Sequence, residues 1–287
     1  MLVNLCIFSF NQVKMIKKSF ICFFVFSAIY AIIVYFYPNK GIGTHQWQEN
    51  QIRAQRYLYE NAKDTVMIGT SLSARLLPDS ISMVSSCSFS ACVVEDGLRI
   101  ILSKNKAPHM VLIESNYFLR PSNGEFVNVN TKGLIPLLRY FLPMLREYNS
   151  PISLIGYCFM RGALAPSDNV DTLRLSRIIE QRKIEDSAHF LTNKQVKDRL
   201  DVIIPLIHEI EARGAKIVLF EMPLNESMIH LPSNDQTRQI VKQVFPPHKY
   251  VYLPIDTTKY LTTDGEHLEL RGQYRYSSFI KKVLSNI

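Results

Sequence analysis

The sequence predicts an α/β protein: a doubly wound parallel sheet of about five strands with a helical insertion, preceded by one transmembrane helix. From about residue 63 onward, short apolar runs rich in β-branched residues alternate with helical patterns, which is typical of a parallel sheet with helices on both faces. The first run breaks at a glycine and is followed at once by small polar residues, as expected at the carboxyl edge of such a sheet, where ligands bind. Near the N-terminus, an uninterrupted apolar run is long enough to cross a bilayer.

The apolar run covers residues 19–37 and follows Lys14, Lys17 and Lys18. The positive-inside rule then leaves residues 1–18 in the cytoplasm and places the C-terminal part in the periplasm or outside the cell. A cleaved signal peptide would have a shorter apolar core and a small-x-small site, which this run lacks. We therefore expect an uncleaved, single-pass membrane anchor, with either Met1 or Met15 as its start.

Residues 38–62 predict a connecting segment, with a hinge at Gly41-Ile-Gly43 and an amphipathic helix over residues 46–61. The globular domain is expected over residues 63–287. Its expected strands are residues 65–68, 83–89, 110–115, 216–221 and 250–255.

Two helices of the domain are well marked. A capping box at Thr192 and Gln195 begins the helix before the fourth strand, Gly214 ends it, and Pro205 predicts a kink within it. The C-terminal helix has apolar residues at helical spacing and would pack on the sheet.

Residues 120–192 break the alternation and predict a helical insertion. Its apolar segment at residues 134–145 is too short and too interrupted by proline to span a bilayer, and Arg139, Arg146 and Arg161 punctuate the region. An ordinary insertion with its own small core is the favoured interpretation. The alternative is a lid or an acceptor-binding surface over the site, which could also lie on the membrane face.

Composition excludes some functions and partners. The net charge of +8 falls to +4 once the four lysines of the first forty residues are set aside, and no basic run is interleaved with aromatic residues, so a nucleic-acid partner is not expected. Cys87, Cys92 and Cys158 follow the anchor. A Cys87–Cys92 bridge is one interpretation, and small buried thiols are the favoured one. No cysteine has zinc-ligand spacing, and we expect neither a metal nor a cofactor.

The candidate nucleophile is Ser71, which follows Gly69 where the first strand ends. The alternative is a helix N-cap, since serine is preferred there. A nucleophilic serine needs a base, and the base needs an acid that fixes its tautomer. Asp264 and His267 have the Asp-x-x-His spacing that lets one loop supply both. A polar turn before a helix would explain Asp264 but not the histidine.

Together, Gly69-Thr-Ser71-Leu-Ser and Asp264-Gly-Glu-His267-Leu resemble the serine and histidine blocks of the SGNH (GDSL-type) hydrolase superfamily. Thr70 stands where the family usually has aspartate. The family's glycine block corresponds to Ser88-Phe-Ser-Ala91, with Ala91 in place of glycine, and its asparagine block to Glu114-Ser-Asn116. The resemblance covers about residues 62–287.

The resemblance implies a flavodoxin-like sheet and a catalytic triad of Ser71, His267 and Asp264. It also implies an oxyanion hole formed by the backbone N–H groups of Ser71 and Ala91 and by the side-chain amide of Asn116. If the turn at Ala91 requires a positive φ, alanine there costs on the order of 1 kcal/mol.

Within the superfamily, the chain most resembles membrane-anchored members that handle acyl esters on cell-surface polysaccharides. The expected function is serine-dependent O-acyl (acetyl) transfer to, or ester hydrolysis from, a cell-envelope polysaccharide. One alternative is a non-catalytic SGNH scaffold that binds glycan or a multi-spanning acyltransferase partner. The other is a lipid esterase, which the aromatic insertion would suit.

Overall fold

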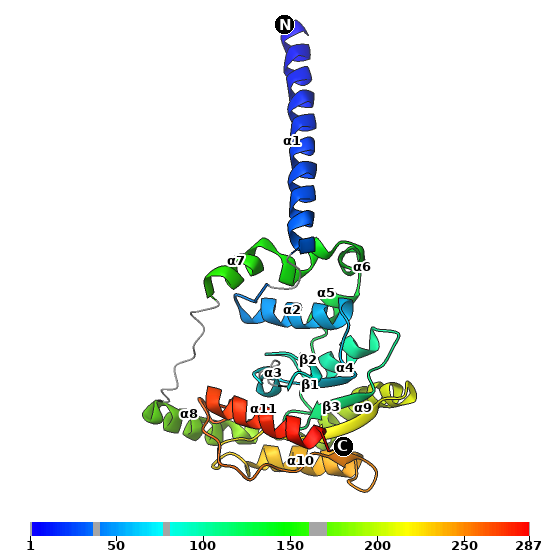
Figure 1. The fold of residues 1–287 in the computed structure, drawn as a ribbon. Helices are drawn as coiled ribbons and strands as arrows, with labels where there is room; N and C mark the ends of the chain where they lie inside the picture. Colours follow the sequence, from blue (N-terminus) through cyan, green and yellow to red (C-terminus); the bar gives the residue numbers. More distant parts are fainter. Residues whose placement is uncertain (1, 37–40, 77–80, 161–170, 287) are drawn as a thin grey trace.

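The computed structural model describes residues 2–36, 41–76, 81–160 and 171–286, and it contains a five-stranded parallel sheet (Figure 1). The strands are β1 (Thr65–Gly69), β2 (Val84–Ser88), β3 (Met110–Glu114), β4 (Lys216–Phe220) and β5 (Val251–Tyr252). Their order in the sheet is β2-β1-β3-β4-β5, and every neighbouring pair is parallel. This is the flavodoxin-like order, so the predicted fold class is confirmed.

Both faces of the sheet are covered, because alternate residues of each strand point to opposite sides. Val66, Val111 and Ile217 face a core that is closed by α2 (Gln46–Tyr59), α4 (Val94–Leu102), α9 (Asn193–Ala212) and α10 (Pro232–Val244). Met67, Leu112 and Val218 face a second core, to which α3 (Ser71–Ala74) and α11 (Leu270–Leu284) contribute.

The predicted signals of α9 are present. Thr192 and Gln195 form a capping box, Pro205 lies inside the helix, and Gly214 follows it with a φ of 93°. The expected fifth strand, by contrast, has only two residues. Pro254 follows it closely, and proline has no N–H for the ladder.

The helix α2 is part of the domain. Ala54 and Tyr57 are buried in the core on the α4 side of the sheet, and Asn50 is 3% exposed. A domain boundary at residue 63 would therefore divide this core.

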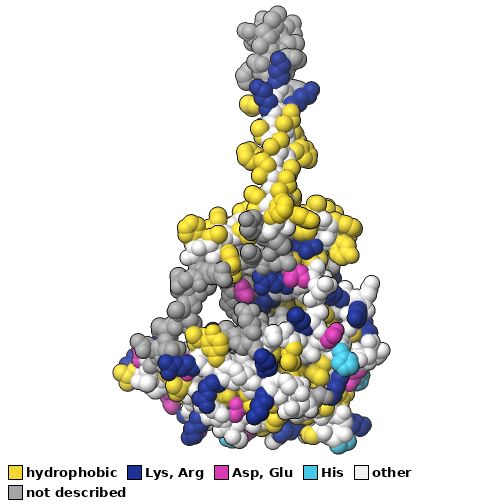
Figure 2. All heavy atoms as spheres, viewed as in Figure 1, with side chains coloured by type: hydrophobic (Ala, Val, Ile, Leu, Met, Phe, Trp, Pro, Cys, Tyr) yellow, Lys and Arg dark blue, Asp and Glu magenta, His cyan; other side chains and the backbone are white. Residues whose placement is uncertain are grey.

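The anchor region forms one helix, α1 (Leu2–Phe36), which projects from the domain (Figure 1). Its segment Lys14–Phe36 is long and apolar enough to cross a membrane, and it includes the described part of the expected anchor at residues 19–37. Figure 2 shows apolar side chains along this segment and on the part of the domain where α1 joins it.

The insertion is helical, as predicted, but it does not form one unit. Its elements are α5 (Glu125–Thr131), α6 (Leu134–Phe141), η2 (Pro143–Leu145), η3 (Glu147–Asn149), α7 (Pro151–Met160), α8 (Thr172–Glu185) and η4 (Asp186–His189). Helices α6 and α7 lie near the base of α1, whereas α8 lies at the opposite end of the domain (Figure 1). The predicted small core is not formed by α6, which has no buried residue. Arg161 lies outside the described residues.

Candidate active site

Ser71 lies directly beyond the carboxyl end of β1, as the first residue of α3. The N-cap of this helix is Thr70, whose hydroxyl accepts a hydrogen bond from the Leu72 N–H at 3.3 Å. The capping role that was the alternative for Ser71 is therefore filled by its neighbour. The Ser71 hydroxyl is left for another partner.

That partner is His267, which comes from the loop before α11. The distance from Ser71 Oγ to His267 Nε2 is 2.8 Å, and His267 Nδ1 lies 2.7 Å from Asp264 Oδ2. An ionised carboxylate accepts a hydrogen bond from Nδ1–H and so leaves Nε2 as the acceptor for the serine proton. The structure thus brings Ser71, His267 and Asp264 together in the order that nucleophilic catalysis requires.

Asp264 is held as a carboxylate. Burial alone would raise the pKa of its side chain, but the hydrogen bond to the His267 ring and those from the backbone N–H groups of His267 and Glu266 act the other way. These two N–H groups donate to Asp264 Oδ1 at 2.8 and 3.1 Å. The net result is a pKa well below the usual range for aspartate, so this acid stays ionised at neutral pH.

The loop that carries His267 is closed at its base and braced at its tip. Thr262 and Leu268 form an antiparallel bridge. At the tip, Gly265 has a φ of 90°, and a Cβ there would collide with Met228 Sδ. The backbone conformation favours glycine at this position, and a larger residue would also have to displace the Met228 side chain.

Glu266 joins the loop that carries His267 to two segments that are distant in the sequence. Its carboxylate accepts a hydrogen bond from the Tyr117 hydroxyl and lies 3.4 Å from Arg182 Nη1 on α8. A cavity of about 190 Å³ adjoins these side chains and also contacts Met228. The loop is therefore held between the chain that follows β3 and the insertion.

The turn that carries Ser71 is organised around Glu114, the last residue of β3, which is fully buried. Glu114 Oε2 accepts hydrogen bonds from the N–H groups of Thr70 and Ser73 at 3.0 and 3.1 Å, and the hydroxyls of the same two residues donate to the carboxylate at 2.6 Å each. A Cβ at Gly69 would collide with Glu114 Oε2 and Ser73 Oγ. The turn thus needs glycine before Thr70 and an acid across from it.

Ala91 adopts the conformation that glycine prefers. Its φ is 57°, and among the described residues no other non-glycine residue has a positive φ. It lies in a turn closed by a hydrogen bond from the Cys92 N–H to the Phe89 carbonyl at 3.2 Å. The turn is clamped by α2, because Asn50 Nδ2 donates to the Ser90 carbonyl at 2.7 Å and Asn50 Oδ1 accepts from the Ser90 N–H at 2.9 Å.

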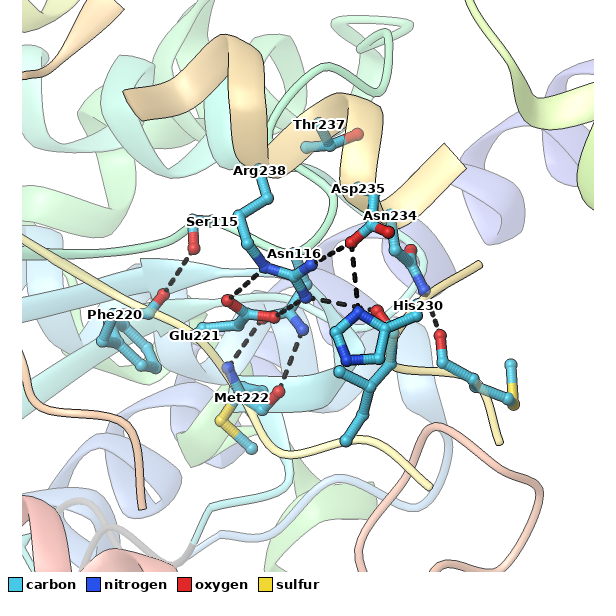
Figure 3. Close-up of polar contacts among 12 residues, drawn as sticks. Ser115, Asn116, Phe220, Glu221, Met222, His230, Asn234, Asp235, Thr237 and Arg238 are labelled. Carbon is cyan, nitrogen blue, oxygen red and sulfur yellow. Dashed lines mark hydrogen bonds and ion pairs between the residues drawn. The ribbon is translucent and has the colours of Figure 1, made fainter. Parts of the chain in front are cut away.

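Asn116 lies two residues beyond β3, and its side chain is paired with the backbone of Met222. Its Nδ2 donates to the Met222 carbonyl at 3.0 Å, and its Oδ1 accepts from the Met222 N–H at 2.7 Å (Figure 3). The adjacent Glu221 is bound by Arg238 of α10, with 2.5 Å between Arg238 Nη2 and Glu221 Oε1 (Figure 3). One amide hydrogen of Asn116 remains for a ligand. The contacts described for Asn116 join it to Met222 and not to the triad.

The cysteines that follow β1 are free thiols. Burial raises the pKa of Cys87 well above its usual range, and burial together with the charge of Asp96 raises the pKa of Cys92 to about 12. The Cys87–Cys92 bridge considered from the sequence is not formed. Within the described ranges, no group of three or more His, Cys, Asp or Glu side chains could hold a metal ion.

The sequence did not single out Glu114 or Asn50 as positioning residues. An acid that ends an otherwise apolar buried strand was a usable signal for Glu114. Asn50 gave no such signal, because polar residues along α2 look the same whether they face solvent or a turn.

Comparisons with known proteins add little to this geometry. No protein-family model and no curated protein matches the chain. A solved structure from Streptococcus pneumoniae, described as a candidate platelet activating factor, matches over 84% of this chain and 92% of its own, with 11% identity and a TM-score of 0.42. A likeness at that level assigns neither a family nor an activity, so the chemistry has to be inferred from the site itself.

Proposed function

We propose that this chain is a membrane-anchored SGNH-type serine enzyme that transfers acyl groups to, or hydrolyses acyl esters from, a cell-envelope polysaccharide. The observation that carries the proposal is the hydrogen-bonded series from Ser71 through His267 to Asp264, with separations of 2.8 and 2.7 Å. A serine–histidine contact with only a structural role needs no ionised acid on the other side of the ring. A catalytic serine needs one, because the acid orients the imidazole and stabilises its charged form.

In the proposed reaction, Ser71 Oγ attacks the acyl carbonyl carbon while His267 Nε2 takes the serine proton. The tetrahedral intermediate collapses, the bond to the leaving alcohol breaks, and His267 returns the proton to that oxygen. Water or a sugar hydroxyl then attacks the acyl-serine while His267 takes its proton. The bond to Ser71 Oγ breaks, and His267 returns the proton to the serine. Asp264 orients the imidazole and stabilises its charged form throughout.

The oxyanion formed in each step needs donors. The Ser71 N–H begins α3, so it has no acceptor within the helix. The Ala91 N–H and the remaining amide hydrogen of Asn116 are the other proposed donors. The positive φ of Ala91 supports its assignment to the family's glycine position.

Envelope polysaccharide is proposed as the substrate because the anchor would place the domain beside nascent glycan. Transfer is favoured over hydrolysis, since a tethered enzyme can hold a bulky acceptor next to the acyl-enzyme and exclude water. The exposed apolar residues of α6 and α7 favour a lipid ester as the second candidate substrate, because they lie where α1 joins the domain.

The first test is labelling with a fluorophosphonate probe, using full-length protein in detergent or nanodiscs. We expect the wild-type protein to be labelled, and Ser71→Ala and His267→Ala to lose labelling and esterase activity while remaining folded. Ser278→Ala and His248→Ala, both at exposed positions, are matched controls and should behave as wild type. Absence of labelling in the wild-type protein would favour the scaffold interpretation.

The second test separates the substrates. Labelled acetyl donor is supplied with glycan acceptors or with phospholipid vesicles, and the products are separated by mass spectrometry. Acetylated glycan supports transfer, and free acetate with stripping of acetylated polymer supports the esterase. If the only product is fatty acid released from the vesicles, the substrate is a lipid and not a polysaccharide.

A further inference from the structure

Helices α6 and α7 both expose large apolar side chains near the end of α1, and we call this region the α6–α7 surface. On α6, Tyr140 and Phe141 are 64% and 68% exposed, and on α7, Phe159 is 80% exposed. The other exposed apolar residues of the two helices are Leu134, Ile135, Leu137, Ile152 and Ile155. Large exposed apolar patches mark interaction sites rather than solvated surface.

The α6–α7 surface adjoins α1 near the C-terminal end of that helix. The hydroxyl of Tyr30 on α1 donates to the carbonyl of Asn149 in η3, between α6 and α7. Val34 on α1 is buried. Tyr30 precedes Phe36 by six residues, so this contact lies about 9 Å before the end of the helix. Helices that lie in the membrane interface insert about 5–10 Å, which is similar to this distance along α1.

The inner side of this region is polar, and Arg146 binds both α6 and α2. Arg146 Nε and Nη2 donate to the carbonyls of Arg139 and Tyr140 at the end of α6, at 2.9 and 3.3 Å, and the Arg146 guanidinium lies 5.1 Å from the centre of the Tyr59 ring. These bonds satisfy helix-end carbonyls that would be costly to leave unpaired near lipid.

The underside of the region is fastened to α2. Gln48 Nε2 donates to Glu147 Oε1 at 2.8 Å and to Ser153 Oγ at 3.0 Å, and the Glu147 N–H donates to Gln55 Oε1 at 2.6 Å. With its polar groups directed inward, the region presents apolar side chains outward, on the side where α1 enters the domain (Figure 2).

We propose that the α6–α7 surface lies in the interfacial layer of the bilayer that α1 crosses, as a second point of membrane attachment. The partner is the lipid itself, because the surface continues from the spanning helix and reaches the depth of its last turns. The aromatic side chains Tyr140, Phe141 and Phe159 suit the headgroup boundary. This attachment does not depend on the proposed catalytic activity.

The chain supplies its own probe site, since Cys158 on α7 is exposed and precedes Phe159. In a full-length Cys6→Ser, Cys22→Ser background, a thiol-reactive fluorophore should label Cys158, because the raised pKa values of Cys87 and Cys92 leave almost no thiolate there. A matched control combines Cys158→Ser with Leu173→Cys, at an exposed apolar position on α8. The proteins are reconstituted in phosphatidylcholine–phosphatidylglycerol vesicles.

Quenching then reports what covers the surface. We expect lipids with a spin label on the upper acyl chain to quench the Cys158 probe at least threefold more than the Leu173→Cys probe, and aqueous iodide to show the opposite preference. Quenching of the Cys158 probe by iodide alone would overturn the proposal. Protection from both quenchers would also overturn it, in favour of a protein partner or a second copy of the chain.

Discussion

At the scale of single residues, the adjacent residues Thr70 and Ser71 have different hydrogen-bonding roles. Thr70 caps α3 and binds Glu114, and this leaves the Ser71 hydroxyl to His267. The same Glu114 reaches across to Ser73. One buried carboxylate therefore fixes the backbone on both sides of Ser71.

Glu114→Ala should destabilise the protein by about 3 kcal/mol or more, because it leaves the buried N–H groups of Thr70 and Ser73 unpaired. Glu114→Gln should cost less than half as much, since one amide oxygen can still accept from both N–H groups. Urea unfolding measures both changes. Equal losses for the two variants would show that the negative charge, and not the acceptor geometry, holds the turn.

Ala91→Gly should be neutral or stabilising and should keep or raise activity, because glycine tolerates the φ of 57° without the strain that alanine bears. Ala91→Val should reduce activity at least tenfold, since a β-branched residue fits a positive φ poorly. Turnover and thermal unfolding are measured for both variants. A strong loss of activity in Ala91→Gly would mean that this turn is not the oxyanion loop.

These residues show what a single sequence can and cannot convey. The spacing of Asp264 and His267 was visible because both lie in one loop. The pairing of Glu114 with Thr70, and of Asn116 with Met222, joins segments 44 and 106 residues apart. Such contacts depend on strand order and register, which short-range patterns do not encode.

At the scale of elements, the apolar runs located β1, β3 and β4 well, because buried parallel strands are continuous apolar segments. The role of α2 was not visible. Its amphipathic pattern indicates a helix but not which surface it covers, and its polar residues bind Ser90 on one side and Ser153 on another.

Asn50→Ala should lower turnover about tenfold or more while the affinity for substrate changes little, because the turn at Ser90 and Ala91 loses its clamp. Gln51→Ala is the matched control. Gln51 is also buried on α2, and its side chain accepts a hydrogen bond from Gln55. The two variants should lose similar stability, and only Asn50→Ala should lose activity. Equal activity in the two variants would show that Asn50 contributes only to packing and does not position the turn.

At the scale of the whole molecule, the stability of the fold should depend on pH through Asp264. The folded-state pKa of this residue is depressed, so its stabilising contribution is complete above the unfolded value of about 4 and is lost as the pH falls toward the folded value. The midpoint temperature of unfolding is compared for the wild type and Asp264→Asn from pH 3 to pH 7. We expect a constant difference above about pH 5 that narrows below about pH 4. A difference that grows on acidification would contradict the assignment.

The position of α2 has a mechanical consequence. Gln48 and Gln55 of this helix bind Glu147 and Ser153 of η3 and α7, and Asn50, which lies between them, binds the turn beside Ala91. A helix of 14 residues is stiff over its own length. A displacement of the α6–α7 surface relative to the domain should therefore be transmitted through α2 to the turn at Ser90 and Ala91. The turnover rate should then change with bilayer thickness and lateral tension. The activity of the domain would in that case respond to the mechanical state of the membrane.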